Sequence, residues 1–268
     1  MQEIDTGSEE LLCRLEGRVA TLVLNRPESR NAITLGMKQA LARMLARLGE
    51  DERVGCLLLT GAGRAFCAGG DTRKMAAEGV LPDPAERLAL LRWEHRIPLA
   101  LHRLPKPVLA VLPGPAAGAG LALALACDLR IAAESAFVTT SYVKLGLSGD
   151  YGGTWFLTRL VGTARARELY FLGERLDARD CERLGLVNRV VPDAELEGQA
   201  LDWARRLSEG APVALRYMKQ NLNRALGAGL EALLDEEAER MVASAQTADY
   251  AEAVAAFREK RPPRFQGR

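Results

Sequence analysis

The stretch Leu59-Thr60-Gly61-Ala62-Gly63-Arg64-Ala65-Phe66-Cys67-Ala68-Gly69-Gly70-Asp71 is the part of this chain that says most about its fold. It completes the short apolar run 56–60, which suits a buried strand, and continues as a glycine-rich loop. A second apolar run, 108–112, leads in the same way into Pro113-Gly114-Pro115-Ala116-Ala117-Gly118-Ala119-Gly120. Buried strands that end in glycine loops and alternate with helical segments predict an α/β fold.

Hydrophobic periodicity predicts the elements around these loops. We expect strands at 19–24, 56–60, 108–112 and 129–132, and helices at about 34–49, 84–103 and 121–126. Beyond about 194 the strand signals stop, and we expect helices at 194–208, 212–226, 229–245 and 249–260. The chain therefore divides into residues 1–193, expected to carry the chemistry, and residues 194–268, expected to serve packing and assembly.

Composition excludes several classes of protein. The 268 residues are 48% hydrophobic and 26% charged, which fits one globular unit. A net charge of +1 gives no reason to expect a nucleic-acid partner or an anionic membrane surface. No apolar run reaches membrane-spanning length, and the polar start, residues 1–5, argues against a signal peptide. Five cysteines without a Cys-x-x-Cys pair indicate reduced thiols and a cytoplasmic location.

Several kinds of active site are also disfavoured. His95 and His102 are the only histidines, and both fall in a segment expected to be helical, which argues against a Cys–His or Ser–His–Asp site. The same shortage of ligands argues against a metal site. Phe66 stands where a dinucleotide-binding loop requires glycine, and the second loop lacks the Lys-Ser/Thr of a phosphate-binding loop.

Asp150 is the acidic residue of a third glycine-rich loop. It lies between Gly146-Leu147-Ser148-Gly149 and Tyr151-Gly152-Gly153-Thr154-Trp155, just before an apolar helical segment. Two loops with free backbone N–H groups and one carboxylate are suited to oxyanion stabilisation coupled to proton transfer. The alternative is a loop carboxylate that caps the following helix.

Taken in order, the motifs of this chain resemble those of the crotonase (enoyl-CoA hydratase/isomerase) superfamily along nearly its whole length. The motifs are Leu24-Asn25-Arg26-Pro27-Glu28, Asn31-Ala32, residues 59–71, Lys106-Pro107-Val108, residues 114–120, Cys127-Asp128, Lys144-Leu145-Gly146-Leu147, the Asp150 loop, Gly185-Leu186-Val187-Asn188 and residues 256–261. The resemblance implies a spiral of ββα units with C-terminal helices that form trimers, often paired into hexamers. It also implies acyl-CoA thioester substrates, so that CoA is part of the substrate and no separate cofactor is expected.

The resemblance assigns roles to individual residues. The backbone N–H groups of Gly70 and Ala119 would form an oxyanion hole. The substrate would further be contacted by Arg26, Ala32 and Ala68 beside the CoA moiety, by Gly118, Ala122 and Tyr142 nearer the acyl group, and by Phe257 and Lys260 of a neighbouring subunit. For Lys260 the alternative is a solvated charge on a terminal helix. The polar segment 72–92 is expected to border the acyl pocket.

This chain departs from the hydratases of the superfamily at both of their catalytic glutamates. Ala122 and Tyr142 occupy those two positions. Asp150 instead stands where the dienoyl-CoA and ring-epoxide isomerases of the superfamily carry an aspartate. We therefore expect an enoyl-CoA isomerase that uses Asp150 as its acid and base. A hydratase-like lyase and a non-catalytic acyl-CoA-binding protein are the alternatives.

Overall fold

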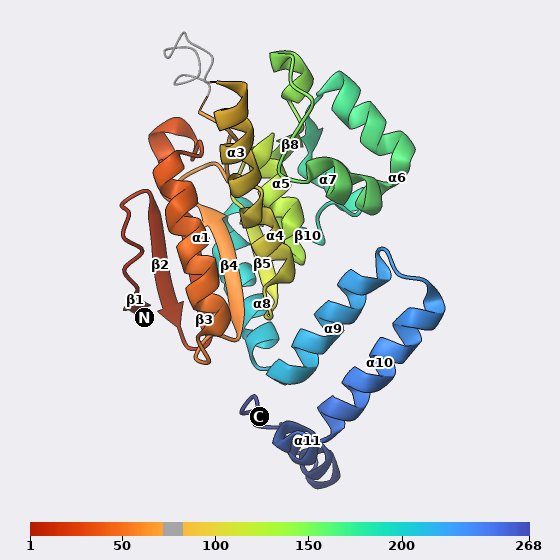
Figure 1. Cartoon of the computed structure of the whole chain (residues 1–268). Coiled ribbons are helices and arrows are strands. Elements are labelled where there is room, and N and C mark those ends of the chain that lie inside the picture. Colours follow the sequence, from red (N-terminus) through yellow and green to blue (C-terminus); the bar gives the residue numbers. More distant parts are fainter. Residues whose placement is uncertain (72–82) are drawn as a thin grey trace.

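The computed structural model of the chain, shown in Figure 1, describes residues 1–71 and 83–268. Residues 72–82, which make up half of the segment expected to border the acyl pocket, lie outside the described residues. The remainder of that segment belongs largely to a helix, α3 (Pro84–Glu94). No helix in the described ranges is sufficiently long and apolar to cross a membrane.

A seven-stranded sheet in the order β1-β2-β3-β4-β5-β7-β10 forms the centre of the fold. Its strands are β1 (Gln2–Glu3), β2 (Leu11–Glu16), β3 (Val19–Leu24), β4 (Cys56–Gly61), β5 (Val108–Leu112), β7 (Leu129–Ala133) and β10 (Arg189–Val191). The first three strands pair antiparallel, and β3 to β10 pair parallel. The α/β prediction and all four predicted strands are confirmed, whereas β1, β2 and β10 were not predicted.

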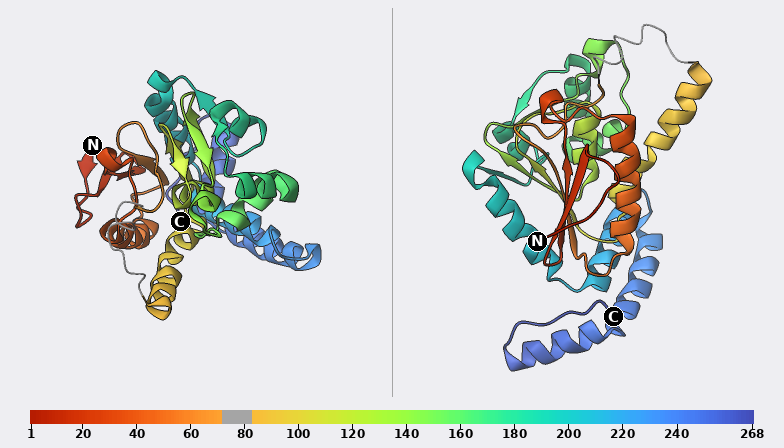
Figure 2. Two further views of the ribbon diagram at one scale, coloured as in Figure 1. Left: turned by 90° about the horizontal axis from the view of Figure 1, so that it is seen from above. Right: turned by 90° about the vertical axis from the view of Figure 1, so that its left-hand side faces the viewer.

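Helices cover this sheet on both faces, as the views in Figure 2 show. On one face α1 (Leu35–Glu50), α4 (Arg96–Arg103) and α5 (Ala119–Ala126) pack in a core with Leu57 and Leu59. On the other face α8 (Leu196–Ser208) packs in a second core with Cys56 and Leu58. Successive residues of β4 thus point to opposite faces, and both faces are apolar because both are covered.

The helix expected at 84–103 is broken into α3 and α4 at His95. Pro98, in the first turn of α4, has no N–H group to bond the carbonyl of Glu94 four residues earlier. His95 lies at this break, as the C-cap of α3 and the N-cap of α4.

A second, smaller sheet is formed by three short strands. Its strands are β6 (Ala116–Ala117), β8 (Phe137–Thr139) and β9 (Leu176–Asp177). The Asp150 loop connects a 3-10 turn, η2 (Tyr142–Leu145), to α6 (Gly153–Leu172), which is kinked at Gly162 with a φ of 76°. A short helix, α7 (Ala178–Arg183), follows β9.

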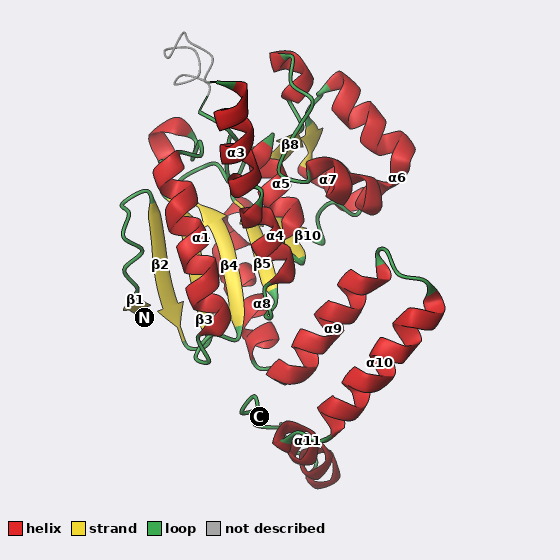
Figure 3. Ribbon diagram, in the orientation of Figure 1, coloured by secondary structure: helices red, strands yellow, loops and turns green. Residues whose placement is uncertain are grey.

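The last three helices are α9 (Pro212–Ala225), α10 (Leu230–Ala245) and α11 (Ala248–Glu259), and they extend away from the sheets (Figures 1 and 3). The buried Lys219 attaches α9 to the core, with Nζ 2.7 Å from a carboxylate oxygen of Asp128. No residue of α10 is buried. The predicted helices of the C-terminal region are confirmed. The division at residue 193 stays a prediction, and α8, the first α-helix after it, packs on the central sheet.

Candidate active site

The two glycine loops that follow β4 and β5 lie side by side. Cys67 and Ala116 form a parallel bridge, and the Ala117 N–H donates to the Cys67 carbonyl at 2.9 Å. Gly120 must be glycine for this contact, because a Cβ atom there would lie 2.3 Å from the Cys67 carbonyl oxygen. The tertiary structure therefore joins two loops that lie about fifty residues apart in the sequence.

Gly70 and Ala119, the predicted oxyanion-hole residues, belong to these adjoining loops. A Cβ atom at Gly69 would lie 3.4 Å from the Ala119 nitrogen, so the first loop contacts the start of α5. Gly118, with a φ of 53°, precedes α5 as its N-cap. Within residues 1–71 and 83–268, neither the Gly70 N–H nor the Ala119 N–H donates to a protein acceptor. The first N–H groups of a helix carry partial positive charge, so Ala119 offers a donor to an anionic oxygen.

Asn31 holds the first glycine loop in shape. Its side chain is fully buried, and its amide donates to the carbonyls of Ala62 at 2.9 Å and Ala65 at 2.8 Å. Its amide oxygen accepts the Arg26 backbone N–H at 2.9 Å. The left-handed φ of 57° at Asn31 is one that asparagine tolerates better than most residues. The sequence singled out Asn31 only as part of the Asn31-Ala32 motif. Its hydrogen bonds to the loop join residues more than thirty positions apart.

Asp150 and Tyr142 form a hydrogen-bonded pair. The Tyr142 hydroxyl donates to Oδ1 of Asp150 at 2.7 Å. Burial, together with the neighbouring carboxylate, raises the pKa of Tyr142 well above its usual range, so its hydroxyl remains a donor at all ordinary pH values. Among the described residues none donates a hydrogen bond to Oδ2 of Asp150. Asp150 does not cap α6, because the N-cap is Gly152 and no side chain bonds there.

Tyr170, which the sequence did not single out, completes an aromatic wall beside this pair. Its ring stacks on Tyr142 with centroids 6.0 Å apart, and burial beside Asp150 raises its pKa to about 12. A Cβ atom at Gly153 would lie 2.5 Å from the Tyr170 hydroxyl and 3.4 Å from Cβ of Ala122. Tyr170 lies on α6, twenty-eight residues after Tyr142, and no local pattern relates the two.

Of the predicted residues Gly118, Ala122 and Tyr142, the last contacts the carboxylate of Asp150 directly. Gly118 adjoins the Tyr142 ring, and Ala122 adjoins Gly153 at the start of α6. A Cβ atom at Gly118 would lie 3.8 Å from the Tyr142 ring, which places that ring against the start of α5. Gly118 and Ala122 belong to α5 and its N-cap, whereas Tyr142 belongs to η2, and the fold brings these two elements together.

Arg26, Ala32 and Ala68, the residues expected beside the CoA moiety, lie next to the first glycine loop. The Arg26 guanidinium donates to the Ala32 carbonyl at 2.9 Å and pairs with Asp71 at 3.1 Å and Glu10 at 3.3 Å. The Ala68 N–H donates to the carbonyl of Arg30 at 2.9 Å, which ties this segment to the loop that carries Gly70. The fold thus brings these three predicted residues together.

Phe257 and Lys260 are not brought to this site within one chain. Phe257 lies on α11 and is 87% exposed, and Lys260 follows that helix as its exposed C-cap. In Figure 1 α11 lies at the bottom of the molecule, whereas α5 lies near the middle and α6 at the upper right.

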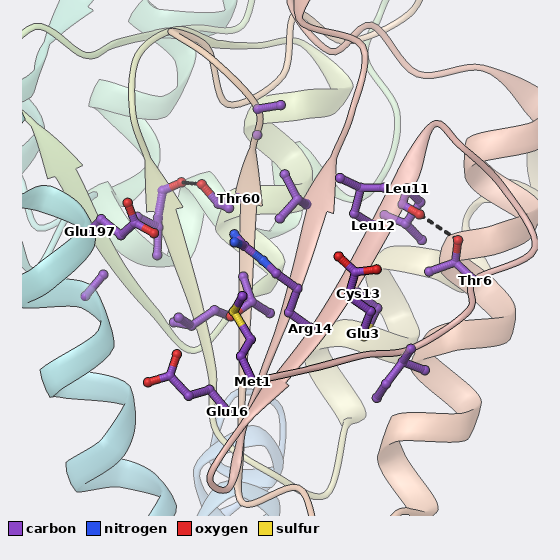
Figure 4. A pocket seen from close by; sticks show the side chains of 18 of the residues that line it. Met1, Glu3, Thr6, Leu11, Leu12, Cys13, Arg14, Glu16, Thr60 and Glu197 are labelled. Carbon is purple, nitrogen blue, oxygen red and sulfur yellow. Dashed lines mark hydrogen bonds between the residues drawn. The ribbon is translucent and has the colours of Figure 1, made fainter.

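A cavity of the described structure lies apart from these residues. Figure 4 shows this space of about 1310 Å³ at the N-terminal strands, where Arg14, Thr60 and Glu197 contribute to its walls. None of the predicted site residues lines it. In the described part of the chain no three His, Cys, Asp or Glu side chains are grouped so as to hold a metal ion.

Comparison with known proteins identifies the family of this chain. The sequence model of the enoyl-CoA hydratase/isomerase family matches residues 14–268. The chain is 40% identical over 260 residues to a 1,2-epoxyphenylacetyl-CoA isomerase of Escherichia coli, covering 97% of this chain and 99% of the relative. It is also 40% identical over 251 residues to a probable enoyl-CoA hydratase of Rhodobacter capsulatus, covering 93% and 95%.

Solved structures of the same family superpose closely on this fold. A putative enoyl-CoA hydratase from Streptomyces coelicolor matches with a TM-score of 0.93 and 37% identity, covering 97% of this chain and 95% of the other. An enoyl-CoA hydratase from Bacillus anthracis matches with a TM-score of 0.92 and 32% identity, covering 97% and 100%. The crotonase-like fold is thereby confirmed, and the chain belongs to the enoyl-CoA hydratase/isomerase family of acyl-CoA enzymes.

Proposed function

We propose that this enzyme is an enoyl-CoA isomerase, acting on a double bond or a ring epoxide, with Asp150 as its acid and base. The observation that carries the proposal is the 2.7 Å hydrogen bond from Tyr142 to Oδ1 of Asp150. This bond orients the carboxylate, and the other oxygen, Oδ2, is left for a substrate proton. Ala122 and Tyr142 supply no carboxylate where the hydratases of the family have glutamates, so Asp150 acts alone.

In this mechanism the thioester carbonyl of the acyl-CoA accepts hydrogen bonds from the N–H groups of Gly70 and Ala119. Oδ2 of Asp150 removes a proton next to the activated system, and the electron pair moves onto the carbonyl oxygen as a conjugated enolate. Loss of one such donor typically raises the barrier by roughly 3–4 kcal/mol. Asp150 then returns the same proton to a different carbon, so the substrate is isomerised with no net gain or loss of atoms.

The proposal includes how CoA is held. CoA is part of the substrate, and no separate cofactor is required. Arg26, Ala32 and Ala68 contact the CoA moiety next to the first glycine loop. Phe257 and Lys260 contact the CoA of a neighbouring subunit in a trimer or hexamer, and their exposure on α11 is compatible with that role. A cytoplasmic location is supported by the five cysteines, all of which are free thiols.

A hydratase-like lyase is the second candidate. It is favoured by the relative from Rhodobacter capsulatus, which is named a probable enoyl-CoA hydratase and is as similar as the isomerase. In that reaction Tyr142 and Asp150 would together hold the water molecule. The hydrogen bond between these two residues argues against a non-catalytic acyl-CoA-binding protein, which has no use for an oriented carboxylate beside the thioester.

Asp150→Asn tests the proposal, because it keeps the size of the side chain and removes the proton acceptor. We expect turnover to fall by ~100-fold to 10,000-fold, with acetoacetyl-CoA binding by calorimetry nearly unchanged. Mass spectrometry of 2-enoyl-, 3-enoyl- and ring-epoxide acyl-CoA substrates identifies the reaction, since hydration adds the mass of water and isomerisation adds none. Native turnover in Asp150→Asn would show that the base lies elsewhere. A product heavier by one water would favour the lyase.

A further inference from the structure

A buried ionic cluster lies behind the Asp150 loop, and the proposed reaction does not use it. Glu94, at the end of α3, is 2% exposed. Its Oε1 lies 2.8 Å from Nζ of Lys38 on α1 and 3.2 Å from a guanidinium nitrogen of Arg87. Its other oxygen, Oε2, accepts the hydroxyl of Tyr151 at 3.3 Å. Both oxygens of this carboxylate therefore have partners. One of these partners, Tyr151, directly follows Asp150 in the sequence.

Tyr151 has a backbone conformation that is uncommon for a bulky residue. Its φ of 55° lies in the left-handed region, and its side chain is only 2% exposed. A bulky residue in that region is held there by its surroundings. The surroundings here are the Glu94 carboxylate, which holds the hydroxyl, and His95, whose ring contacts the Tyr151 ring edge-on at 5.8 Å.

The peptide group between Asp150 and Tyr151 is held at both ends. Its N–H donates to Nε2 of His95 at 3.3 Å, and its carbonyl oxygen accepts the Gly153 N–H at 3.0 Å. A backbone N–H can only donate, so Nε2 of His95 is the acceptor of this hydrogen bond. The orientation of this peptide group sets the direction in which the Asp150 side chain leaves the backbone.

We propose that Glu94 and His95 are positioning residues that hold Asp150 at its working distance from the oxyanion hole. His95 fixes the peptide group that follows Asp150, and Glu94 fixes Tyr151 in the left-handed conformation that this peptide group requires. Tyr142 then fixes the carboxylate itself. This inference rests on the proposed role of Asp150, and neither Glu94 nor His95 touches the substrate.

A purely structural role for the cluster is the competing explanation. Buried ion pairs are frequently no more stabilising than apolar side chains of the same volume, so burial alone does not explain the cluster. The two explanations differ in what they predict for variants that remain folded. A structural role lowers the melting temperature and leaves turnover per folded enzyme intact, whereas a positioning role lowers kcat.

Two variants of His95 separate these explanations. His95→Gln retains an acceptor, since the amide oxygen can take the place of Nε2, whereas His95→Leu retains volume without an acceptor. We expect His95→Leu to lower kcat by roughly 10-fold to 100-fold, the usual effect of a small misplacement of a catalytic group. We expect His95→Gln to recover most of that loss. KM and acetoacetyl-CoA binding should stay near the native values in both variants, because neither depends on the direction of Asp150.

Tyr151→Phe tests the Glu94 contact in the same way. It keeps the buried ring and removes only the hydroxyl, so it decides the question by itself if His95→Leu does not fold. The control is Ile131→Val, which shortens a fully buried side chain of β7 far from the site. This control should lower the melting temperature and leave kcat unchanged.

The decisive measurement combines each variant with Asp150→Asn. If His95 and Tyr151 act through Asp150, His95→Leu and Tyr151→Phe should cause no further loss of turnover or of solvent deuterium exchange in the Asp150→Asn enzyme. Native kcat in both single variants, or losses that add fully to that of Asp150→Asn, would overturn the inference. That result leaves the proposed function standing, provided that Asp150→Asn is itself impaired. Native turnover in Asp150→Asn would instead remove the proposed function.

Discussion

Asn31 shows how a single side chain holds a loop that has no regular structure. It donates to two carbonyls and accepts one N–H, all from backbone groups near the first glycine loop. Asn31→Ala would leave these groups without partners, at a cost of about 1–3 kcal/mol for each buried group that stays unsatisfied. We expect the free energy of unfolding to fall by about 3 kcal/mol, measured by urea unfolding. Turnover should fall as well, because the loop carries Gly70.

Asn31→Asp provides the matched comparison for this prediction. The substitution keeps the size and the acceptor oxygen, but it places a second oxygen against the carbonyls of Ala62 and Ala65. It should therefore be at least as destabilising as Asn31→Ala. An Asn31→Asp variant as stable as the native protein would show that the Asn31 amide does not hold this loop through its hydrogen bonds.

At the level of elements, the contact between α5 and the first glycine loop decides where the Ala119 N–H lies. Gly120 permits this contact, since a Cβ atom there would lie 2.3 Å from a carbonyl oxygen and 2.7 Å from Cβ of Cys67. Gly120→Ala should lower both the melting temperature and kcat, although alanine favours helix by about 1 kcal/mol. Gly198→Ala on α8 is the control, because a Cβ atom there meets nothing within 4 Å. The control should be neutral or stabilising, and equal effects in the two variants would refute the packing argument.

At the level of the whole molecule, the five cysteines link stability to pH. Burial raises the pKa of Cys13 to about 11 and those of Cys56, Cys67, Cys127 and Cys181 to about 12, from an ordinary value of 9.0. The folded chain keeps these protons above pH 9.0, whereas the unfolded chain loses them. The contribution of these five thiols to the free energy of unfolding is therefore fully present below pH 9.0. It should be lost as pH rises toward 11–12. Urea unfolding on either side of pH 9.0 measures this change in the free energy of unfolding.

A thiol reagent should modify the native enzyme slowly and all five cysteines after unfolding.

Assembly also belongs to this scale. Leu230, Leu234 and Met241 share one face of α10 at helical spacing and are 72%, 54% and 70% exposed. Leu233 and Val242 add further apolar side chains on the same helix. An apolar face of this kind favours association, so we predict a trimer or hexamer of the 29.1 kDa chain by light scattering. Leu230→Glu combined with Met241→Glu should shift the mass toward that of one chain, and Arg206→Glu on α8 should not. A native mass of 29.1 kDa would contradict the prediction.

Local sequence was sufficient to predict the fold class, four of the seven central strands and the helical C-terminal region. These features follow from patterns within a few residues, such as the apolar run of β4, and from glycines at positions that tolerate no side chain. The resemblance to the crotonase superfamily, rather than a local pattern, identified the departures at Ala122 and Tyr142 and implied Asp150 as the candidate acid. The break at His95 is not apparent from the helical periodicity of 84–103, which continues through Pro98.

Only the tertiary structure decided how the site is held. The hydrogen bond between Tyr142 and Asp150 requires the turn at η2, and the contacts of Tyr151 with Glu94 and His95 span 57 and 56 residues. Such contacts depend on how distant elements pack, which no local pattern encodes. The sequence by itself therefore determined which residue types are available to the proposed site. The packing of α3, α5 and α6 around the glycine loops decided which of them meet, because hydrogen bonds form only where the fold brings donor and acceptor within about 3 Å.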